Sequence, residues 1–446
     1  MAKRLFGTDG VRGPVGEFLT ADLTLALARA ATQRARVEHP RVLIIRDTRE
    51  SGEMLEAAVA AGVAEAGGAA LTGGILPTSA APLLLLRYGL DLAVVLSASH
   101  NPFQDNGIKI FSSEGSKFPD SWEDEIEARL GGPDLAPKPT GASGGRLVPY
   151  DRAEAEYIAH ARQTFPFDLG GLTLVLDCAH GATSRVAPRL FRALGARIVV
   201  LAARPDGLNI NHKSGALHPE RVQRRVRAAG ANLGLAFDGD GDRLIAVDET
   251  GDIRDGDYAL AICGRHLAAN GRLKMNTVVT TVMANLGLDK ALAEAGIRTV
   301  KTQVGDRYVL EEMVKIGANL GGEQSGHLLF LDQSATGDGI VSALQLLAVM
   351  RETGQPLSAL ASCMSKFPQV LVNVHVREKP PLDSIPGLAD RQAACERELG
   401  AGGRILLRYS GTENLARVMI EGEDKTHIEG IASELARIIK KAVGAR

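Results

Sequence analysis

Apolar and polar positions alternate in blocks along most of the chain, and these blocks predict strands and helices in turn. Short aliphatic runs typical of buried strands occur at 41–47, 92–98, 172–178, 196–201, 233–238, 243–248 and 276–282. Longer stretches with helical spacing occur at 51–67, 183–195 and 219–230. Strands that alternate with helices are typical of α/β layers in which most strands are parallel.

A short internal repeat accompanies this pattern. The segment ANLGLAFDGD at 231–240 and the segment ANLGGEQSGH at 318–327 begin with the same four residues. The segment LDLAVVLSASH at 90–100 follows the strand at 41–47 in an equivalent position. We interpret the three segments as parts of related α/β units, each ending a strand in a polar loop, although matches this short also arise by chance.

The C-terminal part of the chain has a different pattern. Three predicted strands at 369–376, 404–410 and 416–422 precede an amphipathic helix at 425–443, which together indicate a small α+β domain. A glycine- and proline-rich stretch at 131–145 predicts a loop near the end of the first unit. We therefore expect an α/β fold class, with three related mixed α/β domains around a central cleft plus a smaller C-terminal α+β domain. The expected domains are 1–155, 156–256, 257–369 and 370–446.

Composition and charge exclude several classes of function. The 446 residues are 45% hydrophobic and 23% charged, which is enough to build several cores. The net charge of −2 gives no basic field for nucleic acid and no basic run for a membrane surface, so we expect neither partner. The four cysteines lie far apart without C-x-x-C spacing, and no signal-peptide core opens the sequence. These features favour a reduced, cytoplasmic chain.

The loop DGDGDR at 238–243 is the strongest candidate for a metal site. Asp238, Asp240 and Asp242 alternate with glycines, so an extended turn can aim all three carboxylates at one cation. Oxygen ligands of this kind favour Mg²⁺ or Ca²⁺. The alternative is a solvated acidic turn, but three carboxylates so close in sequence repel one another unless a cation lies among them.

An EF-hand loop is a specific alternative for the same residues. Counted from Asp238, position twelve is Glu249, as an EF-hand requires. Position six, however, is Arg243 where the sharp turn needs glycine, and the flanking segments read as strands instead of helices. The EF-hand interpretation therefore fails, and Mg²⁺ that assists chemistry on phosphate fits better.

The loop SASHNP at 97–102 contains candidate nucleophiles. Ser97 and Ser99 follow a buried strand, and no G-x-S-x-G motif is present, which disfavours acyl hydrolysis. A serine beside a divalent cation is suited to phosphoryl transfer. His100 and Lys109 are near in sequence and are candidates to accept a proton, although His100 could equally hydrogen-bond the loop.

Three further loops contain polar groups around glycines. The loop GGEQSGH offers Glu323, Ser325 and His327 to sugar hydroxyls or an amino group, and a plain turn is an equal alternative. The loop RYSGTENLAR has an inventory suited to a phosphate dianion, against the alternative of ordinary surface arginines; its candidate residues are Arg408, Ser410, Gly411, Thr412 and Arg417. The opening FGTDGVRG, with Asp9 and Arg12, indicates either a loop near a functional cleft or a structural turn.

Taken in order, FGTDGVRG, SASHNP, DGDGDR, GEQSGH and RYSGTEN resemble the motifs of the α-D-phosphohexomutase superfamily over the whole chain. The first, fourth and fifth motifs, with PDGLNIN at 205–211, are most similar to its glucosamine branch. Asp306 follows VG where the glucose and mannose branches often have histidine. The segment HKSGALHPE at 212–220 departs from the branch pattern and leaves local details in doubt.

The resemblance implies a mechanism and a set of site residues. Ser99 would hold the phosphate, with Ser97 as the ambiguous neighbour, and a phosphoserine oxygen would join the three aspartates as ligands of one Mg²⁺ per subunit. Arg243 would brace the transferring phosphate, Arg12 would assist, and Lys109 and His100 would be the acid/base candidates. The enzyme would interconvert glucosamine 6-phosphate and glucosamine 1-phosphate through a bisphosphate intermediate, for cell-wall precursor synthesis. The resemblance further implies a sugar 1,6-bisphosphate as activator, a small phosphosugar as substrate and a homodimer.

Three other functions fit part of the pattern. A mutase of the glucose or mannose branch would use the same chemistry with different sugar-binding residues at Glu323 to His327. A sugar-phosphate-binding protein without activity would need no nucleophile, so the serine and the aspartates argue against it. A metal-dependent phosphatase with a phosphoserine intermediate would release inorganic phosphate steadily, where a mutase releases little.

Overall fold

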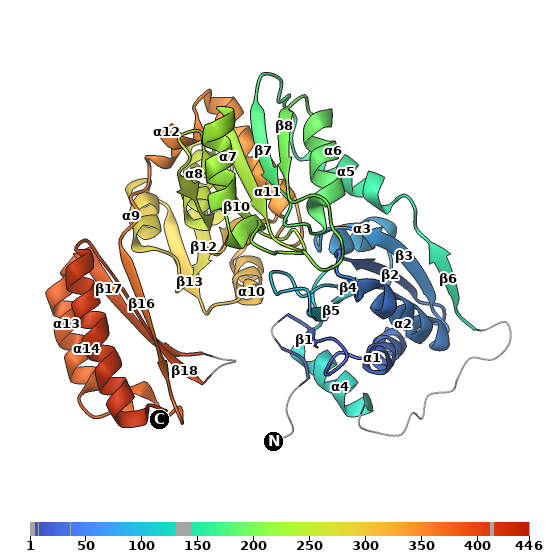
Figure 1. Ribbon diagram of the computed structural model, residues 1–446, viewed down its shortest axis with the longest axis horizontal. Helices are drawn as coiled ribbons and strands as arrows, with labels where there is room; N and C mark the ends of the chain where they lie inside the picture. Colours follow the sequence, from blue (N-terminus) through green and yellow to red (C-terminus); the bar gives the residue numbers. More distant parts are fainter. Residues whose placement is uncertain (1–4, 8, 36, 131–143, 411–413, 446) are drawn as a thin grey trace. The chain divides into compact units, whose positions relative to one another are not determined.

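In the computed structural model, residues 5–7, 9–35, 37–130, 144–410 and 414–445 are described (Figure 1). They divide into two compact units, one formed by residues 1–283 and 297–362 and the other by residues 284–296 and 363–446. Within the described residues, the first unit contains three sheets and the second contains one. The α/β fold class is thereby confirmed, whereas the domain boundaries remain a prediction.

The first sheet is mixed, with its strands in the order β1-β5-β4-β2-β3-β6. Strands β2, β3, β4 and β6 run parallel, and β5 pairs antiparallel with both β4 and β1. The strands are β1 (Val11–Pro14), β2 (Arg41–Arg46), β3 (Ala69–Ile75), β4 (Leu92–Leu96), β5 (Asp105–Ser112) and β6 (Arg146–Pro149). The helices that follow these strands or precede them are α1 (Ala21–Arg34), α2 (Gly52–Glu65), α3 (Ala80–Tyr88), α4 (Asp120–Leu130) and α5 (Ala153–Gln163).

The second sheet has the order β11-β10-β9-β7-β8, with β7 parallel to both of its neighbours and β9–β10 forming an antiparallel hairpin. Its strands are β7 (Thr173–Asp177), β8 (Arg197–Leu201), β9 (Leu233–Phe237), β10 (Leu244–Asp248) and β11 (Ile253–Arg254). The helices of this segment are α6 (Thr183–Ala193), the 3-10 turn η2 (Gly215–Leu217) and α7 (Glu220–Ala229). The hairpin excludes the EF-hand interpretation a second time, because no helix flanks the acidic loop.

The third sheet has the order β13-β12-β14-β15 and ends in the antiparallel hairpin β14–β15. Its strands are β12 (Thr277–Thr281), β13 (Arg298–Thr302), β14 (Leu320–Gly322) and β15 (Leu328–Phe330). The helices of this segment are α8 (Gly256–Ala269), η3 (Lys274–Asn276), α10 (Asp306–Ile316), α11 (Gly339–Thr353) and α12 (Leu357–Ala361). Asp338 caps α11 by accepting hydrogen bonds from the first-turn amides of Ile340 and Val341, which explains why the helix begins there.

The second unit is a three-stranded antiparallel sheet, β16-β18-β17, with α14 packed against β16 and β18. Its elements are α9 (Leu286–Glu294), β16 (Gln369–His375), η4 (Leu382–Ser384), α13 (Leu388–Leu399), η5 (Gly400–Gly402), β17 (Gly403–Tyr409), β18 (Leu415–Gly422) and α14 (Lys425–Val443). Asp424 caps α14. Helix α14 covers the full range predicted from its amphipathic pattern, with its apolar positions buried.

The first three sheets share one arrangement that positions the polar loops. In each, a buried parallel strand ends in a loop and the chain returns as an antiparallel strand, in β4–β5, β9–β10 and β14–β15. The loops between these strands are the sequence motifs at 97–102, 238–243 and 323–327. Across the described residues, no helix is long and apolar enough to cross a membrane.

Candidate active site

Ser99 lies directly against the acidic loop of the second sheet. Its Oγ donates a hydrogen bond of 2.8 Å to Oδ2 of Asp238, and its side chain is buried. Its backbone has φ of 51°, a left-handed conformation that is uncommon outside glycine and is often found at functional sites. Ser97 has a different environment, because its Oγ donates to Asp47 and accepts from the backbone amide of Ser99. Ser97 therefore supports the loop, and Ser99 faces the acidic cluster.

Arg49 holds the loop that contains Ser97 and Ser99, here called the serine loop, in place. Its guanidinium donates to the backbone carbonyls of Ser99 at 3.0 Å and Asn101 at 2.9 Å, and also to those of Pro102 and Asp105. Asp47 balances its charge at 2.9 Å, and both side chains of this pair are almost completely buried. A planar group with five donors is suited to gather several carbonyls at once.

Asp238, Asp240 and Asp242 form a compact, buried cluster. Each offers a carboxylate oxygen that lies within 4.8 Å of the other two. Glycine is required between them, because a Cβ at residue 239 would lie 2.5 Å from the carbonyl oxygen of Ser99, and residue 241 has φ of 73°. The spacing read from the sequence therefore does bring the three carboxylates together.

The cluster fits a hard divalent cation. Among the described atoms, Oδ1 of Asp240 and Oδ1 of Asp242 are buried and accept no hydrogen bond, so both are available as ligands. Burial and the neighbouring carboxylates of Asp242 and Asp240 raise the pKa of Asp238 well above its ordinary value. Burial acts on Asp240 in the same direction, but Lys109 outweighs it and holds the pKa of Asp240 below its ordinary value. A cation among these oxygens would relieve their mutual repulsion.

Magnesium is therefore expected to stabilise the folded chain. At a free Mg²⁺ concentration of about 100 times Kd, binding to the native state alone contributes about 2.7 kcal/mol to the free energy of unfolding. Thermal unfolding of the full chain in EDTA and in excess Mg²⁺ measures the difference, expected as a rise of several degrees in Tm. The variant Asp240→Asn should lose most of this rise, whereas an unchanged Tm in the wild type would contradict the metal site.

Four predicted catalytic residues surround Ser99 and the acidic cluster. Lys109 is buried on β5, 2.8 Å from Asp240 and 3.9 Å from Asp242, so its ammonium compensates the carboxylates. His100 Nδ1 lies 3.4 Å from Ser99 Oγ. Burial, followed by the positive charges of Arg243 and Arg12, lowers the pKa of His100 to about 4, which keeps its ring neutral near pH 7.

The two arginines come from different segments, Arg12 from β1 and Arg243 from the loop before β10. The Arg243 backbone amide donates to Asp238 at 3.2 Å, and its Nε lies 3.9 Å from Asp242. Arg12, on β1, forms an ion pair with Asp9. Among the described atoms, the buried Nε of both arginines has no hydrogen-bond partner, so both can bind an anion.

The GEQSGH loop is joined to the acidic loop by backbone hydrogen bonds. The amide of Leu244 donates to the carbonyl of Gly326 at 3.0 Å, and Arg243 and His327 form an antiparallel bridge. Ser325 is exposed and Glu323 is half-buried, with its carboxylate accepting from the amide of Gly305 at 3.1 Å. His327 is buried, with Nδ1 3.5 Å from Asp242. Glu323 and Ser325 are thus accessible to a ligand, whereas the His327 side chain is almost completely buried.

The predicted phosphate-binding residues belong to the second compact unit. Arg408 on β17 and Arg417 on β18 are direct partners across the antiparallel pair. Burial and the charge of Arg417 lower the pKa of Arg408. Two like charges opposite each other are unfavourable without an anion between them. Ser410 is buried at the end of β17, while Gly411 and Thr412 lie outside the described residues.

The site also contains residues that the sequence analysis missed or only mentioned. Asp47 and Arg49 follow β2 as SASHNP follows β4, so their position after a buried strand was an available signal. Asp9 pairs with Arg12, Lys109 and Lys117. Lys117 lies in EGSKFPD, a segment without glycine-bounded polar clusters or strand pattern, and nothing in the sequence marked it.

Comparisons with known proteins cover almost the whole chain. Four sequence models of phosphoglucomutase/phosphomannomutase match in order: alpha/beta/alpha domain I at 3–135, domain II at 155–251, domain III at 255–367 and the C-terminal domain at 371–438. A phosphoglucosamine mutase from Desulforudis audaxviator is 51% identical, covering 98% of this chain and 97% of its own length.

Solved structures agree with this assignment. A phosphoglucomutase/phosphomannomutase family protein from Burkholderia thailandensis matches with a TM-score of 0.81 and 26% identity, over 99% of this chain and 98% of its own. N-acetylphosphoglucosamine mutase from Aspergillus fumigatus, in complex with GlcNAc-6P and magnesium, shares the fold with a TM-score of 0.65 and 18% identity, over 99% and 96% of the two chains. The chain therefore belongs to the phosphoglucomutase/phosphomannomutase family of phosphohexomutases, and within it to the phosphoglucosamine mutases.

Proposed function

We propose that this chain interconverts glucosamine 6-phosphate and glucosamine 1-phosphate through a phosphate on Ser99 and a bisphosphate intermediate. The observation that carries the proposal is the 2.8 Å contact between Ser99 Oγ and Asp238, at a buried serine with a left-handed backbone. The names of the relatives support the amino sugar as substrate.

The reaction consists of two phosphoryl transfers at one serine. In the first, the bond from phosphorus to Ser99 Oγ breaks as a bond forms to the free sugar hydroxyl; the hydroxyl proton leaves to a base, and the released Ser99 Oγ takes up a proton. The bisphosphate then presents its other phosphate to Ser99, and the reverse transfer regenerates the phosphoserine. His100 is neutral and adjacent to Oγ, so it is our candidate base. Lys109 remains charged and contributes positive potential, with Arg243 and Arg12.

Mg²⁺ would be held by Asp238, Asp240, Asp242 and the phosphate on Ser99. When bound, it would neutralise part of the charge on the phosphoryl group. Magnesium in the Aspergillus structure supports this choice. Glu323 and Ser325 would bind the sugar hydroxyls or amine, and Arg408, Ser410 and Arg417, with Gly411 and Thr412, the distal phosphate. His327 was also predicted as a sugar ligand, but its burial favours a supporting role. We further propose a sugar 1,6-bisphosphate as activator, a homodimer and a cytoplasmic location.

Substrate preference tests the proposed function directly. Initial rates with Mg²⁺ and a trace of sugar bisphosphate would be compared for glucosamine 6-phosphate, glucose 1-phosphate and mannose 1-phosphate. We expect kcat/KM to favour the amino sugar by about tenfold or more, which is about 1.4 kcal/mol of transition-state discrimination. Equal or reversed preference would keep the phosphoserine chemistry and reject the amino sugar as the main substrate.

A further inference from the structure

Six charged or titratable side chains form a closed ring that begins and ends at the candidate metal ligand Asp242. Carboxylates alternate with basic groups around the ring, so each carboxylate has a basic group on both sides and each basic group has a carboxylate on both sides. In order, the contacts are Asp242–Lys109 at 3.9 Å, Lys109–Asp9 at 3.1 Å, Asp9–Lys117 at 2.5 Å, Lys117–Asp306 at 2.6 Å, Asp306–His327 at 3.8 Å and His327–Asp242 at 3.5 Å.

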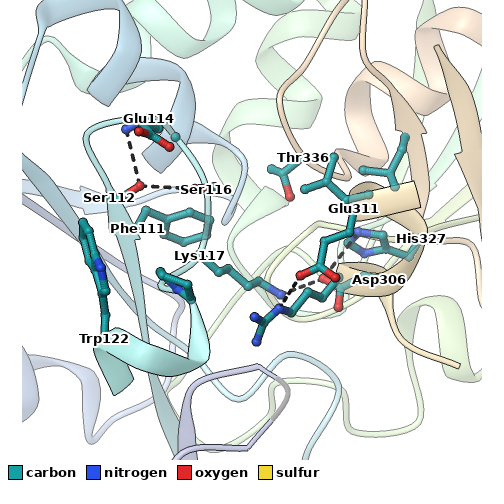
Figure 2. A pocket seen from close by; sticks show the side chains of 15 residues that line it. Phe111, Ser112, Glu114, Ser116, Lys117, Trp122, Asp306, Glu311, His327 and Thr336 are labelled. Atoms are coloured by element: carbon teal, nitrogen blue, oxygen red, sulfur yellow. Dashed lines mark hydrogen bonds and ion pairs between the residues drawn. The ribbon is translucent and has the colours of Figure 1, made fainter. Parts of the chain in front are cut away.

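The ring joins segments that are far apart in the sequence. Lys117 lies between β5 and α4, beside the first sheet, and Asp306 is the first residue of α10, beside the third. Figure 2 shows Lys117 reaching toward Asp306, with His327 next to it, at one side of a cavity of about 290 Å³. Phe111 and Trp122 line another part of the wall.

Lys117 and Asp306 lie on one side of the ring, away from the acidic cluster. Among the described residues, neither forms an ion pair with Asp238, Asp240 or Asp242, whereas Lys109 and His327 both reach Asp242. The side chains of Lys117 and Asp306 are 18% and 21% exposed, so the cavity leaves this side of the ring in contact with solvent. A substitution here changes the charge of the ring without removing a metal ligand.

We propose that the Lys117–Asp306 pair positions the ring and sets the affinity of the acidic cluster for its divalent cation. This inference rests on the proposed function, because it assumes that the cluster binds Mg²⁺. Asp306 holds His327 from the side opposite Asp242, and Lys117 holds Asp9 from the side opposite Lys109. Asp306 thereby limits the effect of His327 on Asp242, and Lys117 limits the pull of Asp9 on Lys109.

The charges give the two single substitutions opposite signs. Without the Asp306 carboxylate, His327 would pair with Asp242 alone and Lys117 with Asp9 alone. The ring would then carry one negative charge fewer, so a cation would bind less tightly. Without the Lys117 ammonium, Asp9 and Asp306 would draw Lys109 and His327 away from the metal ligands, so a cation would bind more tightly. A purely structural role would weaken metal binding in both variants.

The test is Mn²⁺ binding to the full, unphosphorylated chain, measured by electron paramagnetic resonance without substrate. We expect Asp306→Asn to raise Kd by about three- to tenfold, Lys117→Met to lower it, and the double variant to return close to the wild type, because the two opposite changes of charge cancel. Arg307→Gln is the matched control, since Arg307 adjoins Asp306 but pairs with Asp120 and Glu311 outside the ring. Its Kd should not change.

Three results would overturn the inference: an unchanged Kd in Asp306→Asn, weaker binding in both single variants, or a double variant whose Kd does not lie between those of the two single variants. If Asp306→Asn does not fold, Lys117→Met alone decides, because only tighter binding agrees with the proposal. Isomerase assays on the same proteins keep the two claims apart. Wild-type activity tests the proposed function, and for Asp306→Asn we expect a higher Mg²⁺ requirement with kcat near the wild-type value at saturating Mg²⁺.

Discussion

Replacing Ser99 by alanine is expected to abolish isomerisation, with a loss of at least about 10³-fold in kcat, equivalent to about 4 kcal/mol. The substitution removes the only oxygen that would accept and return the phosphoryl group, and no water can replace it without releasing inorganic phosphate. Ser99 is buried, and its hydroxyl bonds only groups at the site, so the fold should tolerate the smaller side chain. Rates with glucosamine 6-phosphate and mass spectrometry of the phosphorylated chain are the measurements.

Ser97→Ala is the matched control for this prediction. Ser97 lies in the same loop, but its hydroxyl bonds Asp47 and the amide of Ser99, so its loss should disturb the loop and leave the nucleophile intact. We expect about a tenfold loss of activity, about 1.4 kcal/mol, with phosphate still found on residue 99. Phosphate on Ser97, or a Ser99→Ala protein retaining substantial isomerase activity, would contradict the assignment.

The choice between these serines shows what sequence can and cannot determine. Both follow the same buried strand, and their spacing is equally compatible with a nucleophile. They differ only in their hydrogen-bond partners. Ser97 bonds Asp47, which follows β2, whereas Ser99 bonds Asp238, which belongs to the second sheet's acidic loop. Such contacts span 50 and 139 residues of sequence, and no local pattern encodes them.

The internal repeat, in contrast, was predictable because it has a local structural cause. The residues immediately before β4, β9 and β14 are Asp91, Asn232 and Asn319. The side chain of each accepts a hydrogen bond from a backbone amide near the start of a neighbouring parallel strand. The donors are the amides of Arg41 to Asp91, Thr173 to Asn232 and Lys274 to Asn319. The same polar residue before the same kind of strand therefore recurs in all three sheets.

The strand that positions Lys109 was not predicted. Strand β5 reads DNGIKIFS, in which polar and apolar residues do not mark a buried strand, although all its residues after Asp105 are buried. Lys109 can be buried there only because Asp240 and Asp9 compensate its charge, and Asn106 because it bonds Ser51 and the backbone. Contacts from distant segments thus allow polar residues to be buried in a strand that the sequence pattern does not predict. The Lys117–Asp306 pair could not be predicted from the sequence for the same reason.

Replacing Arg49 by methionine is expected to destabilise the chain by about 3–5 kcal/mol, the range for removing one member of a buried ion pair. The loss would leave Asp47 without its counter-charge. Burial already raises the pKa of Asp47 against the opposing effect of Arg49, so this pKa would rise further in the variant. Four backbone carbonyls of the serine loop would also lose their donor. Urea unfolding of the full chain measures the change, and isomerase activity should fall with the order of the loop.

Arg46→Met is the matched control, because Arg46 is in the same segment but pairs with the exposed Glu53 and the half-buried Glu56. Pairs of this kind contribute about 0–1 kcal/mol, so its unfolding midpoint should change little. Arg49→Lys should fall between the two, since lysine keeps the charge but cannot reach four carbonyls with one planar group. Adding Asp47→Asn to Arg49→Met should recover part of the stability by removing the unpaired carboxylate. Equal losses in Arg49→Met and Arg46→Met would show that the loop is held by other contacts, among them the bond from Asn211 to the carbonyl of Ser99.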